Sequence, residues 1–183
     1  MLRSPELIQP PAVAPVGLED VKRHCRVDHD EDDEIIEEYI AAAVRKLDGY
    51  TGSLGRALIT QTWRMNAVPD ACGRIRMPFD PIQSIQSVKD GDTDIVADRF
   101  VLDASVTGPF LVATTGWAWP ARAVLTVEFI AGYGDTPPDV PADIRTAIRL
   151  DVEMQYDRPD GPRFEALRQQ YRDIVRRSRR WNI

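Results

Sequence analysis

Two glycines at the end of an apolar run are the first residues whose spacing suggests chemistry. Gly132 and Gly134 stand in the stretch AGYGDTPPDVPADIRTAI, residues 131–148. A dinucleotide-binding loop needs a third small residue three positions later, where a helix starts. Pro137 occupies that position, and further prolines follow before helical periodicity begins. We therefore interpret the stretch as a joint between a strand and a helix, in which the glycines permit a sharp turn.

An acidic run in the first quarter of the chain begins like a calcium-binding loop. Asp28, Asp30 and Asp32 stand at the first, third and fifth positions of such a loop. The sixth position is Asp33, where glycine is required, and the twelfth is Tyr39, where glutamate is required. The run is better interpreted as a solvated helix start whose acids suit the positive end of the helix dipole. A weak nonspecific cation site remains an alternative.

The sequence offers few residues that could form a catalytic or metal-binding site. His24, Cys25 and His29 fall short of the four ligands of a closed zinc site, and Cys72 is the other cysteine. The sequence contains no G-x-S-x-G motif. A metal-dependent nuclease using the acids of residues 28–33 is a weak alternative. The sequence predicts no catalytic residues, no bound metal, no cofactor and no enzymatic activity.

The C-terminal run RRSRRW, residues 176–181, is the remaining candidate. Its arginines could contact DNA phosphates or an acidic groove on a partner protein. They could also only solubilise a helix end, where cations suit the negative end of the dipole. An aromatic residue among arginines near a chain end, after the Pro-Gly-Pro break at 159–162, favours docking to a protein.

Composition limits the classes of function. The 183 residues fit one domain by size, and the net charge of −6 does not favour nucleic acid as the main partner. Two cysteines fit a reducing compartment, and no run is apolar enough for a signal peptide or a membrane span. Acids gather in residues 28–38 and arginines in residues 163–183, which suggests surfaces of opposite sign.

Periodicity predicts an α+β fold, mainly a helical bundle of about four helices with a central inserted block of short antiparallel strands. Residues 1–16 are expected to form an extended arm that orders only when a neighbour binds it, and 17–158 the main domain. Residues 163–183 are expected to form a detachable arginine-rich docking helix and tail. Helices are predicted at 18–25, 31–50 and 141–157. Strands are predicted at 59–68, 74–77, 85–90, 99–102, 109–113 and 124–130.

Several motifs in this order resemble one family. The stretch LEDVKRHCRVDHD (18–30), a helix ending in YTG (50–52) and RALITQTW (56–63) look like the head–tail connector (adaptor) proteins of tailed phages. FIAGYGD (129–135) followed by VPADIRTAI (140–148), and GWAWP (116–120), are similar to further segments of that family. The inserted SLG at 53–55 departs from its usual pattern. Gene transfer agents carry an equivalent adaptor, so both settings stay open.

The resemblance implies a structural protein rather than an enzyme. It implies a homo-oligomeric, dodecameric ring in the neck of a particle, assembled in the bacterial host cytoplasm. The expected partners are the portal protein and a stopper or tail-completion protein, with DNA passing nonspecifically through the channel and no membrane involved. The alternative function is a DNA-binding module that uses the C-terminal arginines.

Two sets of residues follow as candidate sites. We expect the C-terminal segment to dock onto the portal, and the acidic run to line the lumen or the seam between subunits. The docking set is Phe164, Tyr171, Arg176, Arg177, Arg179, Arg180 and Trp181. The lumen or seam set is Asp28, Asp30, Glu31, Asp32 and Asp33.

Overall fold

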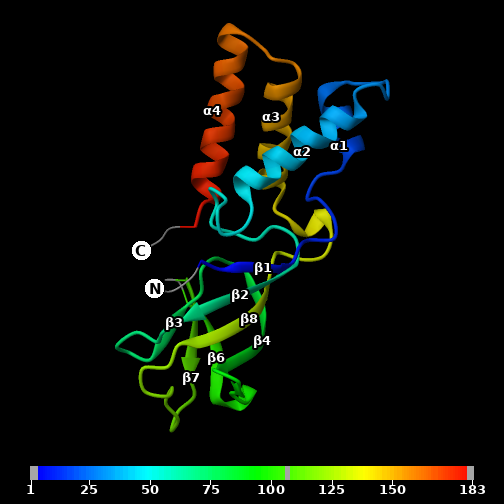
Figure 1. Ribbon diagram of the computed structural model, residues 1–183. Coiled ribbons are helices and arrows are strands. Elements are labelled where there is room, and N and C mark those ends of the chain that lie inside the picture. Colours follow the sequence, from blue (N-terminus) through cyan, green and yellow to red (C-terminus); the bar gives the residue numbers. More distant parts are fainter. Residues whose placement is uncertain (1–3, 106–107, 181–183) are drawn as a thin grey trace.

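The computed structural model describes residues 4–105 and 108–180. Helices form one end of the molecule and strands the other, as Figure 1 shows. The helices are α1 (Leu18–Cys25), α2 (Asp33–Leu47), α3 (Ala142–Tyr156) and α4 (Gly161–Ser178). The strands are β1 (Glu6–Gln9), β2 (Gln61–Ala67), β3 (Arg74–Arg76), β4 (Ile82–Asp90), β5 (Thr93–Asp94), β6 (Phe100–Ser105), β7 (Gly108–Ala113) and β8 (Leu125–Ala131).

The α+β class with four helices and antiparallel strands is confirmed. The expectation of a mainly helical protein is not confirmed, because strands make up a large part of the chain. The segment between α2 and α3, together with β1, forms two sheets with an apolar core of their own, separate from the core of the helices. We call the two halves the helical domain and the strand domain.

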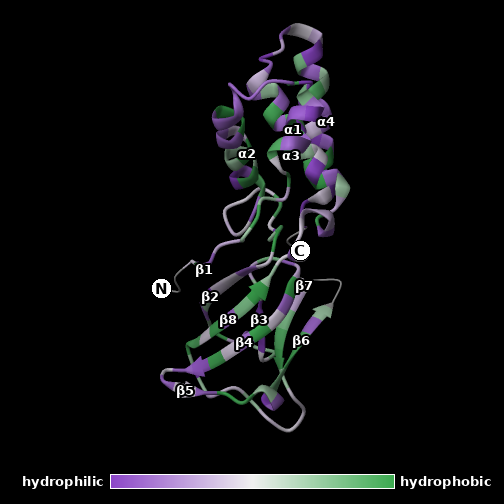
Figure 2. Cartoon of the chain, turned by 90° about the vertical axis from the view of Figure 1, so that its right-hand side faces the viewer, coloured by the Kyte–Doolittle hydropathy of each residue, from purple (hydrophilic) through white to green (hydrophobic). Residues whose placement is uncertain are grey.

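The helices share one apolar core because each presents an apolar stripe. On α2, Ile36, Ile40 and Ala43 are at most 5% exposed, as expected for residues that recur with a period of about 3.6. Both α2 and α4 pack against α3. In Figure 2, α2 and α4 lie on opposite sides of α3.

The last helix belongs to this core. Ile174 is buried in it, and Leu167, Tyr171 and Val175 pack against it from the same face of α4. The expectation of a detachable C-terminal helix is therefore wrong for α4. Removal of this helix would expose the apolar surface of α3 to water.

The helix α2 ends at Leu47, earlier than expected, because Asp48 leaves the helix and its carboxylate binds the segment that follows. Its backbone is extended, and its Oδ1 accepts a hydrogen bond from the Leu58 amide at 2.7 Å. The Gln61 side-chain amide donates to the same carboxylate at 3.1 Å. Burial raises the pKa of Asp48, and these hydrogen bonds oppose that rise. Just after the helix, Gly49 adopts a positive φ of +70°.

The strand domain consists of two antiparallel sheets, ordered β1-β2-β8-β4-β5 and β3-β7-β6. Burial alternates along β8, so one face of the larger sheet points inward. Trp63 on β2 stands opposite Phe129 on β8. Phe79 lies between them, with ring centroids 5.0 Å from Trp63 and 5.7 Å from Phe129. These aromatic rings form the centre of the strand-domain core.

The stretch at 131–140 is a joint between the two domains. Gly132 has a φ of +136°, and a Cβ there would lie 2.6 Å from the Ile59 backbone. The Thr60 amide donates to the Gly134 carbonyl at 2.9 Å, and the Tyr133 amide to the Leu58 carbonyl at 3.0 Å. Two of the segments that cross between the domains are thus hydrogen-bonded to each other, and the glycine allows that close approach.

The N-terminal arm differs from its expectation. Glu6–Gln9 pairs antiparallel with β2 as the edge strand β1. An arm that orders only when a neighbour binds it is therefore the wrong description for these residues. Flanking prolines at 5, 10 and 11 limit the strand to its short length.

Candidate interaction surfaces

The acidic run holds the turn between α1 and α2. Lys22, 6% exposed, places its Nζ 2.6 Å from Asp30 Oδ1 and 2.7 Å from Asp33 Oδ1. These hydrogen bonds raise the pKa of Lys22 and lower that of Asp30. Lys22 therefore pairs with acids across the turn rather than with Glu19 and Asp20, its neighbours in the sequence.

A third acid of the run is also engaged within the chain. The Tyr156 hydroxyl on α3 donates to Asp32 Oδ2 at 2.6 Å, which raises the pKa of Tyr156 to about 12. Asp28 and Glu31 remain exposed. Of the expected lumen or seam set, Asp30, Asp32 and Asp33 thus stabilise their own fold. Glu31 Oε2 lies 3.3 Å from His29 Nδ1, but the Glu31 side chain is 88% exposed.

His24 and Cys25, which were considered as metal ligands, have structural roles. His24 Nε2 lies 2.9 Å from Glu153 Oε2, and Arg163 Nη2 donates to the other oxygen of Glu153 at 2.9 Å. This network joins α1, α3 and α4. Burial raises the pKa of Cys25 to about 11, so its thiol stays protonated and weakly nucleophilic at neutral pH. Within residues 4–105 and 108–180, no group of three or more potential ligands could hold a metal ion.

The expected docking set divides into inward and outward residues. Tyr171 packs against the helical core, and burial raises its pKa to about 12. Phe164 lines a hollow between α3 and α4. Arg176, Arg177 and Arg179 are exposed. Trp181 lies outside the described residues.

Arg180 is buried where the domains meet. It is 7% exposed, its backbone amide donates to the Leu54 carbonyl at 2.8 Å, and Nη1 donates to the Met77 carbonyl at 3.3 Å. Its Nε lies 3.7 Å from Asp80 Oδ2. Burial lowers the pKa of Arg180, and Asp80 opposes this. The expectation that Arg180 docks onto a partner conflicts with this position, because its guanidinium is enclosed by its own chain.

Asp80 also binds a second arginine. Arg56 Nη1 donates to Asp80 Oδ1 at 2.7 Å, and Arg56 Nε donates to the Ser178 carbonyl at 2.8 Å. We call Arg56, Asp80 and Arg180 the junction cluster. It ties the end of α4 to the strand domain. Sequence reasoning missed it because its members are far apart in the chain and no local pattern marks them.

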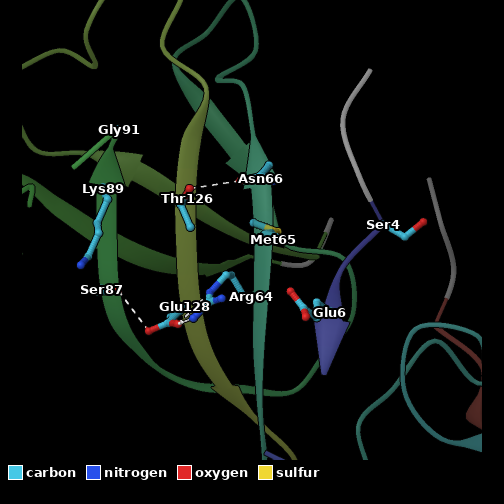
Figure 3. A pocket seen from close by; sticks show the side chains of 10 residues that line it. All are labelled: Ser4, Glu6, Arg64, Met65, Asn66, Ser87, Lys89, Gly91, Thr126 and Glu128. Carbon is cyan, nitrogen blue, oxygen red and sulfur yellow. Dashed lines mark hydrogen bonds and ion pairs between the residues drawn. The ribbon is translucent and has the colours of Figure 1, made fainter. Parts of the chain in front are cut away.

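A polar hollow of about 730 Å³ lies on the outer face of the larger sheet, as Figure 3 shows. Arg64 Nε donates to Glu128 Oε1 at 2.8 Å, and the Thr126 hydroxyl donates to Asn66 Oδ1 at 3.1 Å. These groups come from β2 and β8 and pair across the strands. The hollow is therefore a charge-balanced surface that stabilises the sheet.

In the part of the chain that the structure describes, no helix is both long and apolar enough to cross a membrane.

Comparison with known families gives one match. Residues 16–90 match the model of the phage gp6-like head-tail connector protein family. This region runs from the start of α1 to the end of β4, so it includes parts of both domains. The matched proteins are structural connectors rather than enzymes. No curated protein sequence matches the chain.

Solved structures share the fold over nearly the whole chain. A chain in the neck of an empty gene transfer agent (GTA) particle, computed with C6 symmetry, aligns with a TM-score of 0.77 and 18% identity, covering 99% of this chain and 97% of that chain. A chain in the virion of a native GTA particle gives 0.76 and 18%, with the same coverage. A chain in the neck of a native GTA particle computed with C12 symmetry gives 0.67 and 21%, covering 97% of both. The resemblance indicated by the sequence motifs is thereby confirmed: residues 16–90 are similar to the phage gp6-like head-tail connector proteins, and the fold of nearly the whole chain is similar to that of the GTA neck chains.

Proposed function

We propose that this protein is a structural adaptor subunit in the neck of a tailed phage or gene transfer agent. Copies form a ring between the portal and the next tail or neck component, a stopper or tail-completion protein, and DNA passes through the ring. The ring is dodecameric and assembles in the bacterial host cytoplasm. The observation that carries this proposal is the nearly full-length fold match to a chain in the neck of a GTA particle.

The charge of the protein supports a passage role. The net charge is −6, and exposed acids include Asp28, Glu31 and Glu37. The wall of the channel must let DNA slide past, whereas groups that bind phosphate would hold the DNA back. Asp28 and Glu31 are the two members of the expected lumen or seam set that remain available for such a wall.

The end of α4 supports docking onto the portal. Arg176, Arg177 and Arg179 project into solvent, and Trp181 follows directly in the sequence. Arg180, which stands between Arg179 and Trp181, is held in the junction cluster, so it fixes the end of α4 against the strand domain. We propose that Arg177, Arg179 and Trp181 form the portal contact, which replaces the longer set expected from the sequence.

Replacing Arg177, Arg179 and Trp181 together with alanine tests this contact. Because Arg180 and the helical core are unchanged, the variant is expected to keep the melting temperature of the wild type. Loss of a few interface anchors of about 1.4 kcal/mol or more each would reduce attachment to portal-bearing heads by about tenfold or more. Attachment is measured by co-sedimentation of the purified protein with such heads.

The matched control is Arg23→Ala with Arg99→Ala, which removes two exposed arginines elsewhere. Attachment of the triple variant at the wild-type level would refute the docking surface. The same samples separate the DNA-binding alternative. A DNA-binding module would bind DNA with an affinity that falls steeply as salt rises, whereas an adaptor would hardly bind it.

A further inference from the structure

The outer faces of α2 and α4 carry opposite charges. The two helices flank α3, so these faces lie on different sides of the helical domain, as Figure 2 shows. The outer face of α2 carries Glu34, Glu37 and Glu38, and that of α4 carries Arg172 and Arg176. We call them the acidic face and the basic face. Neither takes part in the apolar core.

The negative charges of the acidic face are not neutralised by other described residues of the same chain. Glu34, Glu37 and Glu38 are exposed, and none of them forms an ion pair with another described residue. Glu34 and Glu38 stand four positions apart. Like charges at this spacing destabilise an isolated helix by about 0.2–0.5 kcal/mol per pair. The arrangement is therefore unfavourable in the single chain.

The basic face has the same spacing with the opposite sign. Arg172 and Arg176 stand four positions apart on α4 and are both exposed. Arg172 forms no ion pair within the described residues, and Arg176 Nη2 is 3.8 Å from Asp173 Oδ1 with its side chain 78% exposed. Four residues span about 6 Å along a helix, so two carboxylates and two guanidiniums at this spacing can face each other in register.

Both faces also have a small apolar component. Ile35, 41% exposed, lies beside Glu34 on α2. On α4, Ala166 and Arg176 line a shallow hollow of about 540 Å³. A small residue allows another helix to approach, and an exposed isoleucine provides apolar area to bury on contact.

We propose that the acidic face of α2 in one copy packs against the basic face of α4 in the next copy, with Glu34 and Glu38 opposite Arg172 and Arg176. This inference rests on the proposed ring. The second copy is the occupant because one chain carries both complementary faces on different flanks. A contact between unlike faces can repeat from copy to copy and close into a ring.

Charge reversal tests the seam. One variant carries Glu34→Lys and Glu38→Lys, and another carries Arg172→Glu and Arg176→Glu. Each places like charges across every seam, which costs several kcal/mol, so complete rings should fall by about 100-fold or more. The variants replace the wild type in particle-producing cells, and rings on purified particles are counted by electron microscopy. All substituted side chains are exposed, and thermal unfolding checks that each variant folds.

The decisive result is whether combining the two charge reversals restores ring formation. Co-expression of the two variants should restore rings, because alternating copies then present opposite charges at every seam. A single chain with all four substitutions should restore them as well. The control Asp92→Lys with Asp94→Lys reverses two exposed acids of the strand domain and should leave rings intact.

The outcomes separate this inference from the proposed function. Intact rings in both double variants overturn the seam and leave the adaptor role in place. Loss of rings without restoration by either combination also overturns it. If wild-type particles contain no ring of this protein, the proposed function fails instead.

Discussion

Replacing Phe79 with alanine is expected to lower the free energy of unfolding by about 3–5 kcal/mol. Phe79 is fully buried, and its ring contacts Trp63 and Phe129 from the neighbouring strands β2 and β8 of the larger sheet. Truncation removes the apolar transfer energy of the ring, and the cavity left behind loses packing contacts. Since a domain is typically stable by only about 5–15 kcal/mol, this change removes a large part of the margin.

Urea unfolding followed by tryptophan fluorescence measures this effect, because Trp63 lies in the affected core. The control is Val96→Ala. Val96 is 59% exposed, so its truncation should change the free energy of unfolding by no more than about 0.5 kcal/mol. Equal effects of the two changes would contradict the strand-domain core described above.

Replacing Asp80 with asparagine is expected to lower the free energy of unfolding by about 2 kcal/mol. Asp80 is the one acid of the junction cluster, and its carboxylate is within 3.7 Å of Arg180 and 2.7 Å of Arg56. Loss of its charge leaves Arg180 buried without a counter-charge. The value is below the range for fully buried pairs because the Asp80 side chain is 22% exposed and the Arg56 side chain 26%.

Chemical denaturation measures the stability, and hydrogen exchange measures protection of the Arg180 amide. Both should fall, since the end of α4 is held at the junction. Asp98→Asn is the matched control, because Asp98 also pairs with an arginine but is 76% exposed. Wild-type stability and unchanged protection in Asp80→Asn would show that the junction cluster does not hold the end of α4.

The elements with strong periodicity were predictable from the sequence. The stripe of Ile36, Ile40 and Ala43 indicates α2, and alternation from Thr126 to Ile130 indicates β8. Such patterns are local consequences of which side faces a core. The joint at Gly132 was also predictable, because glycine and proline constrain the backbone directly.

The long-range contacts were not predictable in this way. The strand β1 has four exposed residues and no alternation that burial would impose. Arg180 was expected on the surface with its neighbouring arginines, yet the fold places it beside Met77 and Asp80. Lys22 pairs across the α1–α2 turn because of the turn's shape. In each case the partner is set by tertiary structure and leaves no mark in the nearby sequence.

Cryo-electron microscopy of particles from cells that produce this protein tests the adaptor role most directly. The account predicts a ring between the portal and the tail whose subunits fit the helical and strand domains, with twelvefold symmetry like that of the similar GTA neck. In each subunit the end of α4 should contact the portal. A neck built from other proteins, with this chain absent from it, would contradict the account.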